Sequence, residues 1–110
     1  MGVDWSKEIE FSLEFVRRLI ERGIIASFGN DLDRARKAIE RKMRNESVVI
    51  DNPSERYPNQ SWCVISIEGI GLAKIPVAET PRYIKAITIA CPVTDPTCKE
   101  AYRRRFMPKA

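Results

Sequence analysis

The sequence predicts an α+β fold, in which helices pack on one face of a single antiparallel sheet. Three observations lead to this prediction. In the first half of the chain, two segments repeat apolar residues at the spacing of amphipathic helices. From Val48 onward the apolar period falls to two, which is typical of strands. The links between these strands are too short for a parallel crossover, so neighbouring strands must run antiparallel.

The first helix is expected to begin with Asp4 as its N-cap and to run to about Arg22. Its apolar face would be broad: Ile9, Leu13, Val16 and Ile20 recur at steps of three and four, and they are flanked by Phe11, Phe15 and Leu19. Gly23 follows where a left-handed C-terminal residue is wanted. A link over residues 24–29 then leads to the next helix.

The second helix is expected to start after Asn30 or Asp31 and to end near Asn45. The side turned to the core would carry four apolar residues, Leu32, Ala35, Ile39 and Met43. The opposite side would carry a basic stripe of four residues, Arg34, Lys37, Arg41 and Arg44. We therefore expect this helix to present cations to solvent or to a ligand.

The strands are expected over residues 48–51, 62–68, 72–77 and 83–91. A turn-rich loop over residues 54–60 precedes the second of these. Gly69 and Gly71 have the placement of a tight hairpin turn, and so do not form a phosphate loop. A last helix would run from the cap Asp95 to about Phe106. The whole chain is expected to be one domain, 1–110: two N-terminal helices, an antiparallel three- or four-stranded meander and a short C-terminal helix, in the order ααββββα.

Composition limits the chemistry, because none of the 110 residues is histidine. Ser–His and Cys–His nucleophile pairs and histidine zinc sites are therefore excluded. The cysteines Cys63, Cys91 and Cys98 have no ligand spacing, so we expect no metal and no cofactor. Among them, only Cys98 is a candidate for a lowered pKa, since it lies in the first turn of the last helix. With no apolar span and no secretory segment, we expect a cytoplasmic protein without a membrane partner.

Nucleic acid is the first candidate partner, because the net charge is +4 and the cations are unevenly distributed. Cations about a turn apart on the stripe of the second helix can contact successive phosphates. In the alternative interpretation, which we favour for the stripe alone, it is a solvated face neutralised by Asp33 and Glu40 at i,i+4 spacing.

Two further clusters support the same prediction. The tail brings Arg103, Arg104 and Arg105 between Tyr102 and Phe106, a combination suited to phosphates and unpaired bases. The two aromatic residues can equally form the buried edge of the last helix. On the sheet, Lys74, Lys85 and Tyr83 would share one face.

The order of the elements resembles that of the small toxin nucleases of the RelE/ParE kind, although the first strand usual in those proteins is not predicted here. The resemblance implies binding to RNA or to gyrase, and phosphodiester chemistry run by lysine, arginine and tyrosine. We expect binding to RNA or DNA rather than catalysis, and any catalysis would be that of a histidine-free ribonuclease. The alternative is a non-enzymatic protein-binding module or inhibitor, or a homodimer, with Trp5 and Trp62 as interface anchors. All the binding proposals depend on the two basic segments converging on one surface.

Overall fold

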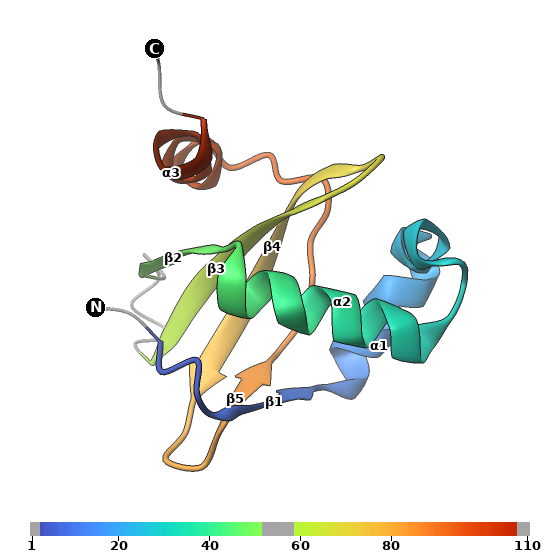
Figure 1. The fold of residues 1–110 in the computed structure, drawn as a ribbon, viewed down its shortest axis with the longest axis horizontal. Coiled ribbons are helices and arrows are strands. Elements are labelled where there is room, and N and C mark those ends of the chain that lie inside the picture. The colour runs from blue at the N-terminus through green and yellow to red at the C-terminus, as the bar shows by residue number, and fades with distance from the viewer. Residues whose placement is uncertain (1–2, 52–58, 108–110) are drawn as a thin grey trace.

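A computed structural model describes residues 3–51 and 59–107, which form a five-stranded sheet with helices on both faces (Figure 1). The elements in chain order are β1 (Glu8–Phe11), α1 (Leu13–Glu21), the 3₁₀ helix η1 (Ile24–Phe28), α2 (Leu32–Asn45), β2 (Val48–Asp51), β3 (Gln60–Ile67), β4 (Gly71–Glu79), β5 (Tyr83–Ala86) and α3 (Pro96–Phe106). The α+β class is confirmed. The order differs from the prediction by a strand ahead of the first helix.

The sheet is mixed, so the prediction of a purely antiparallel meander is wrong. The strand order is β1-β5-β4-β3-β2, and the last four strands are joined by antiparallel pairs as expected. The additional strand β1 pairs in parallel with β5, with Ile9 beside Ile84. The short links of the sequence constrain only consecutive strands, and β1 is separated from β5 along the chain by two α-helices, a 3₁₀ helix and three strands.

The predicted helix start at Asp4 is wrong, because Glu8–Phe11 is a strand. Its residues alternate in burial: Ile9 is buried, whereas Glu8 and Glu10 are exposed. Helix α1 begins only after Ser12, whose side-chain oxygen accepts a hydrogen bond of 3.0 Å from the Phe15 amide. The same hydroxyl donates to the carbonyl of Ile87 at 2.5 Å. Ser12 therefore caps α1 and ties it to the sheet.

Helix α1 packs on one edge of the broad apolar face that was predicted for it. Phe15 and Leu19 are fully buried, whereas the exposed fraction is 90% for Leu13 and 53% for Ile20. The apolar residues of α1 cover about half of its circumference, with Phe15 and Leu19 at one edge of that arc and Leu13 and Ile20 at the other, so the sequence does not say which edge packs most deeply. The selection comes from the strand before it, since Phe15 packs against Phe11 with ring centroids 4.8 Å apart.

The local chemistry of the remaining elements agrees with the prediction. Asp31 caps α2 by accepting from the Arg34 amide at 3.1 Å, and the helix ends at Asn45. Gly23 and Gly69 have positive φ angles of 71° and 81°, as the helix end and the hairpin turn require. Asp95 caps α3. The strand predicted over 83–91 ends earlier, at Ala86, and most of the predicted loop over 54–60 lies outside the described residues.

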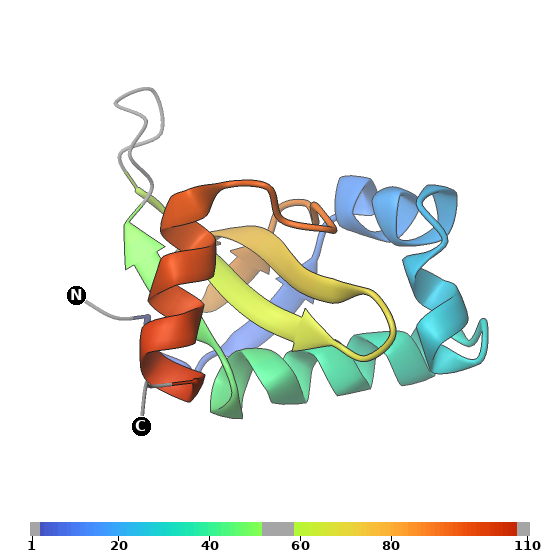
Figure 2. The same cartoon turned by 90° about the horizontal axis from the view of Figure 1, so that it is seen from above.

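The helices are not confined to one face of the sheet, which corrects another expectation (Figure 2). Helices α1 and α2 cover the main core, to which β3 contributes Cys63 and Ile65. Helix α3 covers the opposite face, where Cys98 packs with Val64. The physical reason is the continuous apolar run at the centre of β3, since a strand that is apolar on both faces must be covered on both.

Candidate nucleic-acid interface

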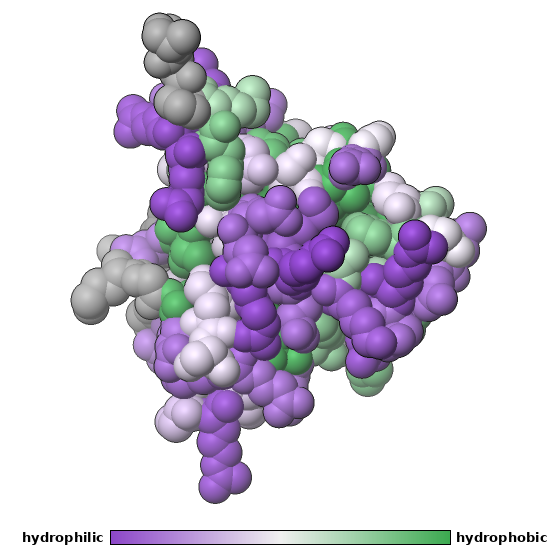
Figure 3. Space-filling view, viewed as in Figure 1, coloured by the Kyte–Doolittle hydropathy of each residue, from purple (hydrophilic) through white to green (hydrophobic). Residues whose placement is uncertain are grey.

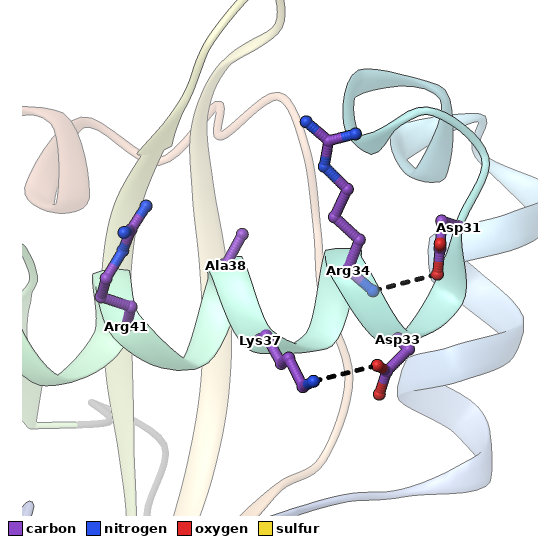
Figure 4. A pocket seen from close by; sticks show the side chains of 6 residues that line it. All are labelled: Asp31, Asp33, Arg34, Lys37, Ala38 and Arg41. Atoms are coloured by element: carbon purple, nitrogen blue, oxygen red, sulfur yellow. Dashed lines mark hydrogen bonds and ion pairs between the residues drawn. The ribbon is translucent and has the colours of Figure 1, made fainter.

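The basic stripe of α2 is divided into two rows in the structure. Figure 4 shows Arg34, Ala38 and Arg41 projecting from one side of the helix, whereas Lys37 turns to Asp33. At about 100° per residue, a spacing of seven places Arg34 and Arg41 within about 20° of each other around the axis. The same spacing joins Lys37 to Arg44 in a second row, about 60° to the side.

The second row is neutralised by carboxylates of its own helix. Lys37 lies 3.2 Å from an Asp33 oxygen, and Arg44 Nε lies 3.6 Å from a Glu40 oxygen. Arg44 also donates from Nη1 to the backbone carbonyl of Trp5. Both predicted i,i+4 pairs are therefore confirmed. In the second row, Lys37 forms a solvent-exposed ion pair, and Arg44 is partly buried and joins α2 to the backbone at Trp5.

The first row keeps its charge available. Within the part of the chain that the structure describes, neither Arg34 nor Arg41 forms an ion pair, and both are exposed. The Nη1 atom of Arg34 lies 3.6 Å from the position that a Cβ on Gly29 would occupy, so the guanidinium rests over the turn between η1 and α2. These two arginines are the unpaired half of the predicted stripe.

Both arginines line a groove of about 290 Å³ between α2, η1 and the hairpin of β3 and β4. We call it the α2 groove; its lining consists of Ser27, Phe28, Arg34, Ala38, Arg41, Lys42, Ile67 and Glu68. A second hollow of about 530 Å³ adjoins it and shares Arg34, Ala38 and Arg41. Hydrophilic side chains cover α2 across the middle of the molecule in Figure 3.

The α2 groove combines three cations with a partly apolar floor. Arg34, Arg41 and Lys42 supply the positive charge, and Glu68 is the one carboxylate in the described lining. Phe28 is half-buried, so one side of its ring is supported by the core. Such a lining suits a ligand with phosphate groups and a flat apolar part.

The arginines of α3 lie on the opposite face of the sheet from the α2 groove. Arg103 and Arg104 share the carboxylate of Glu100 at 2.5 Å and 3.1 Å. The hydrogen bond from Arg103 is the main reason that the pKa of Glu100 lies below its usual range. Arg105 lies over the ring of Phe106, 5.6 Å from its centroid. The expectation that the two basic segments converge on one surface is therefore wrong.

The aromatic residues of α3 are partly used in packing. Tyr102 is half-buried against the cluster of Val64 and Val93, and its ring centroid lies 4.6 Å from that of Phe106. Tyr102 therefore agrees with the alternative prediction that the rings form the packed edge of the helix, whereas Phe106 is exposed. The arginines between them are the exposed side.

The lysines of the sheet share a face but do not form a cluster. The ammonium of Lys74 lies 4.1 Å from the ring centroid of Trp62, a cation–π contact. Lys85 is exposed on β5, opposite Ala78, which is four residues further along β4 than Lys74. At about 3.3 Å per residue this offset separates the two lysines by about 13 Å. The predicted anchors Trp5 and Trp62 are both half-buried.

The prediction of a lowered pKa at Cys98 is wrong, because the side chain is buried. Burial raises the pKa of the Cys98 thiol, and the nearby carboxylate of Asp95 raises it further. Burial also raises the pKa of Cys63, to about 12. Over residues 3–51 and 59–107, no three metal-ligating side chains of the His, Cys, Asp and Glu types gather in one place.

Six groove residues were not among the predicted nucleic-acid contacts: Ser27, Phe28, Ala38, Lys42, Ile67 and Glu68. The sequence does contain a signal that separates the two rows of the stripe. Lys37 and Arg44 each have an acid four residues earlier, whereas the corresponding residues for Arg34 and Arg41 are Asn30 and Lys37. The unpaired arginines are those without this acid.

None of the described helices has the length and apolar character needed to cross a bilayer. Comparison with known proteins gives no match to a family model, to a curated protein or to a solved structure.

Proposed function

We propose that this protein binds the phosphodiester backbone of single-stranded RNA in the α2 groove. The observation that carries the proposal is the pair of unpaired guanidiniums of Arg34 and Arg41, on one side of α2 and on the wall of one groove. Their spacing of seven residues corresponds to about 10 Å along the helix axis. That separation lets the two guanidiniums contact different phosphates of one strand.

The residues of the groove suit this ligand in three ways. The planar guanidinium can donate two parallel hydrogen bonds to one phosphate, which ammonium groups cannot do. Lys42 adds a third positive charge beside Arg41. Phe28 offers a ring on which an unpaired base can stack, so a single strand is favoured over a duplex, whose bases are already stacked.

The test compares two double variants that remove the same charge from opposite faces. Arg34→Ala/Arg41→Ala is expected to weaken binding of a fluorescein-labelled single-stranded RNA about tenfold or more at low salt. It should also reduce the slope of log affinity against log salt by about 1.4, which is about 0.7 for each lost phosphate contact. Fluorescence anisotropy at several salt concentrations measures both quantities.

The matched control is Arg103→Ala/Arg104→Ala, because both of these arginines are exposed on α3 and already paired with Glu100. This variant should leave the affinity within about threefold of the wild type. The opposite result, with loss of binding only in the α3 variant, would move the interface to that helix. Unchanged binding in both variants would refute a nucleic-acid interface at either place. DNA of the same sequence tests whether the sugar matters.

A catalytic version of this proposal is supported by the position of Glu68, the carboxylate of the α2 groove. In a histidine-free ribonuclease, Glu68 would accept the proton of a 2′-hydroxyl as its oxygen attacks the adjacent phosphorus. The arginines would stabilise the charge that develops there, and Lys42 would protonate the departing 5′ oxygen. End-labelled RNA should then be cleaved by the wild type and not by Glu68→Gln. If the wild type binds the RNA and the RNA stays intact after incubation, cleavage is refuted and only the binding proposal stands.

A further inference from the structure

The edge strand β1 is an uncovered part of the sheet. It pairs only with β5, so its other side has no strand partner among the described residues. Lys7 fixes the start of the strand, with its ammonium 2.6 Å from a Glu79 oxygen and 2.8 Å from the carbonyl of Thr80. The edge is therefore held in an extended form, with backbone donors and acceptors that a further strand can use.

We propose that β1 receives an extended segment of another protein that carries lysine or arginine at alternate positions. The inference is based on the negative charge of the two glutamates of β1. Glu8 and Glu10 alternate with the buried Ile9 along β1, both are exposed, and neither forms an ion pair within the described residues. Lys85 is the register partner of Glu10 on β5, yet no ion pair joins them. Opposite charges directly across a strand pair stabilise it, so an added strand with cations on this face is favoured.

The same glutamates disfavour a second copy of this chain as the occupant. If two copies of β1 paired, residues directly opposite each other would point to the same face of the joint sheet. The apolar residues of both copies would have to share one face, so a glutamate of one copy would lie opposite a glutamate of the other. Two antiparallel copies of β1 could then pair about Ile9 or about Glu10. Both registers place a glutamate opposite a glutamate, which is destabilising.

The inner face of the edge also has room for the other side chains of an added strand. A hollow of about 340 Å³ lies between β1 and α2, and its lining consists of Glu8, Ile9, Phe11, Asp33, Arg36, Lys37, Glu40 and Arg44. Strand β1 contributes the apolar Ile9 and Phe11 to this lining, beside which a small apolar residue such as valine fits, whereas α2 contributes two acids and three bases. The segment that matches both faces therefore alternates cationic and small apolar residues.

An apolar anchor lies next to the end of this edge. Leu13, two residues after β1, has an exposed fraction of 90%, and Ile20, two turns along α1, has one of 53%. Large aliphatic side chains exposed to this degree gain free energy when a partner covers them. A segment that continues past Phe11 would reach Leu13 first.

The experiment uses two synthetic peptides, one of alternating Lys and Val and one of alternating Glu and Val. The wild type should bind the Lys–Val peptide about five- to tenfold more tightly than the Glu–Val peptide. The variant Glu8→Lys/Glu10→Lys should reverse this preference, whereas the control Glu21→Lys/Glu46→Lys, at exposed positions outside β1, should keep it. Fluorescence anisotropy gives the affinities, and hydrogen exchange should show slower exchange at Glu8–Phe11 in the complex.

Three results would overturn the inference. The first is equal binding of both peptides to the wild type. The second is peptide-induced protection at β2 rather than at β1. The third is a stable wild-type dimer in light scattering with β1 amides already protected, because a second copy would then cover the edge. None of these results bears on the RNA proposal, which uses the α2 groove.

Discussion

Replacing Ser12 tests the boundary between β1 and α1, on which the edge strand and the packing of the first helix both depend. The hydroxyl of Ser12 makes two hydrogen bonds, one accepted from the Phe15 amide and one donated to the Ile87 carbonyl. Loss of an N-cap costs about 1 kcal/mol. Leaving a partly buried carbonyl without a donor costs about 1 kcal/mol more. Ser12→Ala should therefore lower the free energy of unfolding by about 2 kcal/mol.

The assay is urea unfolding followed by far-UV circular dichroism. With an m-value of about 1.5 kcal/mol/M, the midpoint of Ser12→Ala should fall by about 1.3 M. Ser12→Thr keeps the hydroxyl and should recover most of this loss. Ser12→Asp keeps an acceptor for the Phe15 amide but has no proton for the Ile87 carbonyl, so it should recover only the capping part.

The control is Asp4→Ala, because a helix that began at Asp4 would depend on that residue as its cap. In the structure the Asp4 carboxylate accepts from the amide and hydroxyl of Ser6 in an exposed turn. Asp4→Ala should therefore leave the urea midpoint nearly unchanged. A large loss in Asp4→Ala together with no loss in Ser12→Ala would refute the strand β1 and the packing derived from it.

Three further predictions concern the core, the thiols and the pH dependence of stability. Leu19→Ala should lower the free energy of unfolding in urea by about 3 kcal/mol, because Leu19 is fully buried. The exposed Leu13 should matter little, so Leu13→Ala should stay within about 0.5 kcal/mol of the wild type. Equal losses in the two variants would contradict the packed side of α1. Burial raises the pKa of all three thiols, and only Cys91 is partly exposed. A disulfide reagent at neutral pH should therefore react with Cys91 at most in the folded protein and with all three cysteines in denaturant. Rapid reaction of Cys98 in the folded protein would contradict its burial. The hydrogen bond from Arg18 lowers the pKa of Glu14 from 4.5, so this ion pair stabilises the fold above about pH 4.5, and its contribution is lost as the pH falls through the lower pKa of the folded state. Urea unfolding of Glu14→Gln should therefore show a smaller loss of stability than that of the wild type between about pH 5 and pH 3. Equal losses in the two proteins would contradict a stabilising pair.

Local chemistry was enough to predict much of the fold. Asp31, Gly23 and Asp95 lie at helix ends because their side chains or backbone angles satisfy groups within a few residues of them. The same is true of the turn at Gly69. Such features depend on short-range contacts, so they can be read from one segment at a time.

The parts that were mispredicted depend on distant partners. A four-residue strand such as β1 carries little periodic signal, and its register is set by β5, near the other end of the chain. Likewise, α3 covers a sheet face that exists only when β3 and β4 have paired. The candidate site follows the same rule. The helical period predicted the stripe of α2, but the groove beside it requires the hairpin that carries Glu68.

The central claim, that RNA binds in the α2 groove, is tested most directly by titrating isotope-labelled protein with single-stranded RNA and following the amide resonances. We expect the largest shifts at Ser27, in α2 around Arg34 and Arg41, and at Glu68, with little change in α3. Shifts confined to α3, or none at an RNA concentration that saturates anisotropy, would contradict the claim.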